Sequence, residues 1–392
     1  MAIITDFPMG VIDVIAGWID SPDDALHLAV TSRVMANVLA PRHTQLRIII
    51  CPISSRCVWS LLANDVALAR NVRVLWLTMN NGHFRTPTAF LERHPDCNHC
   101  GVQALNEAAQ VKMKRDDERM LMAALKNMVN LTHFDWRHRQ TNRITAACEP
   151  DGRDIWTALA SCSNVTDLRL YEGGWCKIWG SAIFAMSNLT VFHYSTCYID
   201  PPGRVDCTTL GVMLRERCPH LQDLRLEMYS DYSMEVYPPD IGPSILTGRW
   251  PDLSSLRLRV AACHSTHIII SFLEAHPGLR HLSIDNWVGC TTISDEPDED
   301  ELDRIPEPLS CTFPPGILPG LETLQCHAGQ AIDILPSACS RPHGDSRIIT
   351  HVIGDPANPL LRLAEFMSLA ASLPNVEILH KARLEETLAS TS

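Results

Sequence analysis

Residues 218–228 have the sequence CPHLQDLRLEM, and the pattern formed by Leu221, Leu224 and Leu226 recurs along the chain. In this pattern one apolar residue, here termed the anchor, is followed by apolar residues three and usually five positions later. The anchors are Val72, Leu131, Val165, Leu189, Leu221, Leu253, Leu279, Leu321 and Val376. The last two apolar positions alternate around a single residue, which predicts a short strand with one buried face at each repeat.

Apolar residues at helical spacing precede most anchors, so the predicted unit is a helix, a turn and a strand. Ile155, Trp156 and Leu159 form such a group before Val165. Several neighbouring anchors lie 24 to 34 residues apart, within the range of solenoid repeats. One unit buries too little apolar surface to offset the entropy of ordering it, so the units must stack on one another. We therefore expect an α/β fold with parallel strands on an inner face and helices outside.

Three segments depart from the regular spacing. Residues 347–353 (RIITHVI) lie midway in the long gap after Leu321 and are predicted to form an extra strand. An insertion near 80–120 runs into a predicted helix at 115–128. Residues 294–308 are acidic and contain proline, which favours a solvated loop that leaves the array; the alternative is an acidic docking segment.

The composition is that of a globular protein, with 46% hydrophobic and 20% charged residues. A net charge of −12 argues against nucleic-acid binding through bulk electrostatics. No apolar run of about 18 residues is present, which argues against a membrane span, and acidic residues interrupt the start of the chain, which argues against a secretory signal. The 15 cysteines have no framework spacing, so we expect reduced thiols and a location in the cytoplasm or nucleus.

Local motifs for catalysis or metal binding are few. His94, Cys97, His99 and Cys100 lie within HPDCNHC, but a single C-x-x-C without a distant partner pair predicts a polar loop rather than a zinc site. Cys263, His264 and His267 are interpreted as structural residues at the start of a helix. Cys162 and Cys218 each lie three residues before an anchor, where other repeats have Met, Trp or Leu, which predicts core packing. With no nucleophile elbow, phosphate-binding loop or dinucleotide motif, we expect no enzymatic activity and no cofactor.

The residue between the two strand leucines should face away from the core, on the inner surface. These residues are Trp76, Asp135, Arg169, His193, Arg225, Arg257, Ser283 and Gln325. Tyr171, Glu227, Arg259 and His327 follow two positions later on the same side. A substrate surface is predicted at Trp76, Arg169, Arg225, Arg257 and Arg259, suited to an acidic or phosphorylated segment. In the alternative interpretation the arginines only pair with Asp223, Glu227 and Asp285.

Residues 7–41 are predicted to form two or three short helices. Phe7, Val11, Ile12, Ile15 and Ile19 follow a helical spacing, and SPDD at 21–24 has the proline and acidic residues of a helix start. About 40 residues cannot enclose a substantial core of their own. We therefore expect this segment to pack against another surface.

The two parts of the chain resemble two known modules. The repeats resemble leucine-rich repeats in a helix-containing form, over residues 47–382. Residues 1–46 resemble an F-box, in the opening Phe7–Pro8 pair, the aliphatic pairs that follow, the Asp24, Leu26, Leu28 step and the V-x-S-R element at 30–33. Met35 stands where F-box sequences often have tryptophan. Residues 383–392 are expected to form a disordered tail.

This resemblance implies a substrate-recognition subunit of a Skp–cullin–F-box ubiquitin ligase, in which the repeats hold a protein substrate. The residues that it assigns to the contact with the Skp-type adaptor are Phe7, Pro8, Val11, Ile12, Ile15, Leu26, Leu28 and Val30. In the alternative, the helices only cap the first repeat, and the chain is a leucine-rich-repeat scaffold or interaction protein outside the ubiquitin system.

Overall fold

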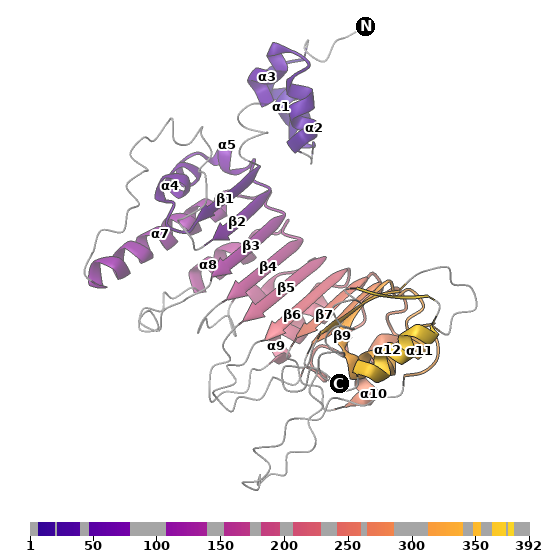
Figure 1. Cartoon of the computed structure of the whole chain (residues 1–392). Helices are drawn as coiled ribbons and strands as arrows, with labels where there is room; N and C mark the ends of the chain where they lie inside the picture. The colour runs from indigo at the N-terminus through magenta and orange to yellow at the C-terminus, as the bar shows by residue number, and fades with distance from the viewer. Residues whose placement is uncertain are drawn as a thin grey trace. The chain divides into compact units, whose positions relative to one another are not determined.

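The computed structural model describes residues 7–19, 22–39, 47–78, 107–138, 153–172, 182–196, 207–228, 241–259, 265–285, 313–339, 348–353, 363–373 and 375–379. The chain divides into two compact units, one of residues 1–172 with 176–186 and one of residues 173–175 with 187–392. In both units helices alternate with parallel strands (Figure 1), which confirms the α/β class. The predicted loop at 294–308 and the predicted tail at 383–392 lie outside the described residues.

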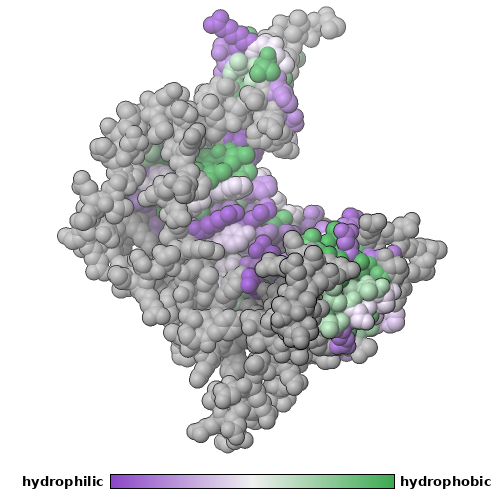
Figure 2. Space-filling model, in the orientation of Figure 1, coloured by the Kyte–Doolittle hydropathy of each residue, from purple (hydrophilic) through white to green (hydrophobic). Residues whose placement is uncertain are grey.

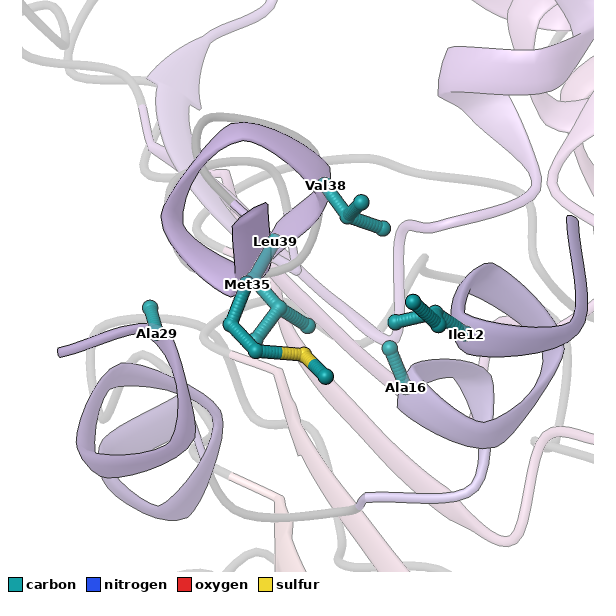
Figure 3. Close-up of a cluster of buried hydrophobic side chains, with 6 residues drawn as sticks. All are labelled: Ile12, Ala16, Ala29, Met35, Val38 and Leu39. Atoms are coloured by element: carbon teal, nitrogen blue, oxygen red, sulfur yellow. The ribbon is translucent and has the colours of Figure 1, made fainter. Parts of the chain in front are cut away.

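The first unit begins with three short helices, α1 (Met9–Gly17), α2 (Pro22–Ala29) and α3 (Arg33–Leu39). The carbonyl of Pro8 accepts hydrogen bonds from the backbone N–H groups of Val11 and Ile12 at the start of α1. The Oγ of Ser32 accepts one from the N–H of Met35 at 3.1 Å and so caps α3. The buried core among the helices (Figure 3) consists of Ile12, Ala16, Ala29, Met35, Val38 and Leu39. The three helices thus enclose a small apolar cluster of their own.

The strands of the first unit are β1 (Ile48–Pro52), β2 (Val74–Thr78), β3 (His133–His138) and β4 (Asp167–Glu172). Each pairs in parallel with the next. The helices are α4 (Arg56–Asn64), α5 (Val66–Ala69), α7 (Glu107–Asn127), α8 (Arg153–Ala160) and the 3-10 turn η4 (Ala182–Ala185). The helix predicted at 115–128 is confirmed, although α7 starts eight residues earlier. Arg56 of α4 is hydrogen bonded to the nearly buried carboxylate of Asp117 in α7, which ties these two helices together.

The second unit continues the same order. Its strands are β5 (Val191–Thr196), β6 (Asp223–Met228), β7 (Ser255–Arg259), β8 (His281–Asp285), β9 (Thr323–His327), β10 (Ile348–Ile353) and β11 (Val376–Ile378). All are parallel to their neighbours. The helices are α9 (Cys207–Val212), which runs into the π-helical turn η5 (Met213–Arg217), α10 (Thr266–Glu274), α11 (Ala328–Cys339) and α12 (Leu363–Ser372). β10 confirms the extra strand predicted at 347–353.

The anchor residues lie in the cores of the two units. All are at most 1% exposed except Val376, which is half-buried in the last described strand. Cys162 and Cys218 are buried three residues before their anchors, and burial raises the pKa of each thiol to about 11. A thiol with such a pKa is protonated at neutral pH, so both cysteines are packing residues, as predicted.

Side-chain hydrogen bonds join successive repeats at the turns before β3 and β4. The amide of Asn130 donates to the carbonyl of Arg70 at 2.9 Å, and that of Asn164 donates to the carbonyl of Val129 at 2.7 Å. Both asparagines directly precede an anchor. They satisfy carbonyls that a turn leaves unpaired, and so they fix the spacing between neighbouring repeats.

Candidate functional site

The residues between the buried strand leucines line up across the sheet of each unit. Parallel pairing places Trp76, Asp135 and Arg169 in one row of the first unit. In the second unit it places His193, Arg225, Arg257, Ser283 and Gln325 in one row. This confirms the predicted rows within each unit. Hydrophilic residues gather over this strand face (Figure 2).

In the first unit, each arginine of the strand face has a carboxylate of its own. Arg137 meets Asp135 through Nε–Oδ1 and Nη2–Oδ2 contacts of 3.0 and 2.9 Å, and Arg169 meets Asp167 through two contacts of 2.9 Å. Both aspartates are almost fully buried. The hydrogen bond to the aspartate is the main reason that the pKa of each guanidinium is raised. These bidentate pairs leave little free charge at Arg169.

Two aromatic residues lie beside those pairs. The guanidinium of Arg137 stacks over the ring of Tyr171, 5.3 Å from its centroid. Trp76 is in register with Asp135 and is 39% exposed, which is unusual for a tryptophan in a central strand. This part of the face therefore combines neutralised charge with exposed aromatic surface.

In the second unit, two arginines share one carboxylate. Arg225 contacts Oε1 of Glu227 through Nε at 2.8 Å and Nη2 at 2.7 Å. The Nε of Arg257, on the next strand, lies 2.9 Å from the same Oε1. The Glu227 side chain is only 4% exposed, whereas those of Arg225 and Arg257 are 28% and 30% exposed. The predicted pairing of arginines with Glu227 is confirmed; the side chain of Asp285 lies outside the described ones.

Polar side chains occupy the rest of this face. The Nε2 atom of His193 lies 2.7 Å from a carboxylate oxygen of Asp223. The Oγ of Ser283 donates to the amide oxygen of Gln325 at 3.3 Å, which leaves β8 and β9 polar but uncharged in this row. Arg259 is half-buried in β7, in register with Glu227 and Asp285.

In the described part of the chain, no three His, Cys, Asp or Glu side chains lie together in a group that could hold a metal ion. His94, Cys97, His99 and Cys100 lie outside the described residues, as do Cys263 and His264. His267 is exposed in α10.

A second candidate surface lies on the N-terminal helices. Of the residues predicted to meet an adaptor, Phe7, Pro8, Val11, Ile15 and Val30 are exposed, and Leu28 is half-buried against the helical core. The side chain of Leu26 lies outside the described ones. Ile12 is 1% exposed, so the expectation that it faces a partner needs correction. Its side chain belongs to the core that holds the three helices together.

Two exposed apolar residues of the N-terminal helices were missed by the sequence interpretation, namely Val14 and Trp18. Val11, Val14, Ile15 and Trp18 have the spacing i, i+3, i+4, i+7, so they form one stripe along α1. Trp18 is 82% exposed and Val14 62%. Helix α1 therefore has two apolar faces, one in the helical core, where it packs against α3, and one open. The spacing was available in the sequence and could have revealed this second stripe.

No protein-family model matches the chain, and no curated protein is significantly similar to it in sequence. Among the residues that the structure describes, no helix is both long and apolar enough to cross a membrane.

Proposed function

We propose that this chain is a substrate-recognition subunit of a Skp–cullin–F-box ubiquitin ligase. In this proposal the N-terminal helices are an F-box that binds a Skp-type adaptor, and the parallel-strand units are leucine-rich repeats that hold a protein substrate. The observation that carries the proposal is the open apolar stripe of α1, formed by Val11, Val14, Ile15 and Trp18.

An exposed stripe of this kind is costly for a protein that acts alone. Val, Ile and Trp side chains along one helix face expose contiguous apolar surface, which in folded proteins marks an interaction site. The stripe is not needed for the fold, because Ile12, Ala16 and the residues of α3 already fill the helical core. A helix that presents residues at i, i+3, i+4 and i+7 fits an apolar groove on a partner. Trp18 has the size and exposure of a binding anchor.

The repeats would supply the second contact. Their strand faces carry polar and aromatic side chains over rigid, paired strands, which suits recognition of a protein segment. The chain would then act by proximity: holding a substrate near a ubiquitin carrier raises the local concentration of the reacting groups. Such a role needs no catalytic residue and no cofactor on this chain.

One observation favours the alternative role, in which the helices cap the repeats of a scaffold protein. Arg47, which directly precedes β1, is 2% exposed and donates a hydrogen bond to the carbonyl of Ala16 near the end of α1. A cation at a helix C-terminus is favourable, so this contact ties α1 to the first strand. A cap of this type would not by itself require the open stripe on α1.

Titration of the purified chain with a purified Skp-type adaptor separates the two roles. The wild-type chain should form a complex, and Trp18→Asp should abolish it without unfolding the protein. Val129→Asp is the matched control, because Val129 is also an exposed apolar residue of the first unit, remote in sequence from α1. Absence of binding by the wild-type chain would favour the scaffold, and equal binding by all three proteins would contradict the role of the α1 stripe in the contact.

A further inference from the structure

The two arginine groups on the strand faces differ in how far carboxylates neutralise them. Arg137 and Arg169 each engage both oxygens of one aspartate. Arg225 and Arg257 meet at a single oxygen of Glu227. Taken by themselves, these three groups have charges of +1, +1 and −1 and sum to one positive charge.

The hydrogen-bond donors of Arg225 and Arg257 indicate the same site. Arg257 approaches Glu227 only through Nε, and no hydrogen bond of its terminal nitrogens is present among the described residues. Its side chain is 30% exposed, so part of it can be reached by a ligand. Arg225, in register with Arg257 on the neighbouring strand, adds its second terminal nitrogen. Strands in a sheet are about 4.8 Å apart, so one small anionic group can contact both guanidinium groups.

Other charged groups around Arg225 and Arg257 limit the negative charge that a ligand can carry at this site. Asp223 precedes Arg225 by two residues on the same face and is hydrogen bonded to His193. Arg259 lies in register with Glu227 and Asp285. A phosphate group carries a charge of about −1.5 to −2 at neutral pH and would lie close to the Glu227 carboxylate, which repels it. A carboxylate matches the summed charge of +1 on Arg225, Arg257 and Glu227.

We propose that Arg225 and Arg257 form a receiving site for one carboxylate of an acidic, unphosphorylated segment of the substrate protein. Glu227 holds the two guanidinium groups in place and also sets the charge that they can accept. Ser283 and Gln325, next in the row, offer uncharged polar groups to the flanking part of the segment. This inference rests on the proposed role of the strand face in holding a substrate, and it does not depend on the adaptor contact.

The test uses the full chain and three peptide libraries with randomised flanks and a fixed central residue, which is Glu, phosphoserine or Gln. The wild-type chain should retain the Glu library about tenfold more than the Gln library, the order expected of one charge-assisted hydrogen bond, and more than the phosphoserine library. Arg257→Gln should lose this preference. Arg169→Gln is the matched control, because Arg169 is similarly exposed but is already neutralised by Asp167. This variant should keep the preference.

Glu227→Gln provides a second test that a simple folding defect cannot imitate. Removing the internal carboxylate leaves two positive charges, so retention should rise and the preference should move toward phosphoserine. Equal retention of the Glu and Gln libraries by the wild-type chain overturns the proposal, as does a wild-type preference for phosphoserine or an unchanged preference in Arg257→Gln. Adaptor binding is measured on the same proteins. In the wild-type chain, absence of the peptide preference with adaptor binding intact counts against this inference alone, and a peptide preference without adaptor binding counts against the ligase role alone.

Discussion

The Nε2 atom of His276 accepts a hydrogen bond from the backbone N–H of Trp250 at 3.0 Å, while its Nδ1 donates to the carbonyl of Phe272 at 2.6 Å. Both Trp250 and His276 lie three residues before an anchor, in consecutive repeats. At this position most other repeats have Met, Cys or Leu as packing residues. His276 packs against the rings of Trp250 and Phe272 and also satisfies a backbone group of the preceding repeat. It therefore has to be neutral, with the proton on Nδ1.

This arrangement predicts a pH-dependent stability. Burial lowers the pKa of His276 below its ordinary value of 6.5, because an imidazolium would lose its hydration. The unfolded chain takes up a proton near pH 6.5 and the folded chain only at lower pH, so the free energy of unfolding should fall as the pH drops below about 6.5. Urea unfolding between pH 5 and 8 measures it. In His276→Leu, which replaces the imidazole with an apolar residue, the dependence should be flatter; equal slopes in both proteins would contradict the assignment.

Because the two faces of α1 differ in burial, two neighbouring substitutions should differ in their effect on stability. Ile12→Ala removes buried surface from the helical core and should lower the free energy of unfolding by about 2 to 4 kcal/mol. Val14→Ala, on the open stripe, should change it by less than about 0.5 kcal/mol. Chemical denaturation followed by circular dichroism measures both. Similar losses in the two variants would mean that the stripe is part of the fold.

The asparagine contacts between repeats predict a measurable contribution to stability. Asn164→Ala leaves the carbonyl of Val129 without its 2.7 Å amide donor and should cost about 1 kcal/mol. Ser163→Ala is the control, because Ser163 is the adjacent exposed residue and its side chain makes no hydrogen bond within the described structure. Chemical denaturation followed by circular dichroism measures the free energy of unfolding of both variants. An equal, small effect of both changes would show that the amide contact does not stabilise the stack.

Two glycines differ in the space around them. A Cβ at Gly211 in α9 would lie 2.2 Å from the carbonyl oxygen of Ser244, whereas one at Gly278 would meet nothing within 4 Å. Gly211→Ala should therefore destabilise the second unit by a few kcal/mol, since backbone must move. Gly278→Ala should be neutral or slightly stabilising, because alanine restricts the unfolded chain. Melting temperatures of the two variants test this; a stable Gly211→Ala would show that α9 and Ser244 separate easily.

The strands could be predicted from the sequence because their pattern depends only on local spacing. The leucine triplets, the extra strand at 347–353 and the packing role of Cys162 and Cys218 follow from alternation and from position relative to an anchor. Pairing of Arg225 with Glu227 could be anticipated because residues two apart on a strand share a face. The same rule applies to Asp135 with Arg137 and to Asp167 with Arg169, which the sequence interpretation did not consider.

The orientation of α1 could not be predicted in the same way. Its sequence has apolar residues on two faces, and the placement of α2 and α3 decides which face is buried. Ile12 was therefore assigned to a partner, although it packs inside, and Trp18 was overlooked. The sharing of Glu227 by Arg225 and Arg257 likewise depends on side-chain conformations across two strands, which spacing alone does not determine.

Affinity purification of the full chain from cells, followed by mass spectrometry, tests the ligase role most directly. The wild-type chain should recover a Skp-type adaptor and a cullin, and Trp18→Asp should lose both while keeping the other proteins that bind the repeats. Recovery of neither adaptor nor cullin with the wild-type chain, or their undiminished recovery with Trp18→Asp, would contradict the proposed role of the α1 stripe.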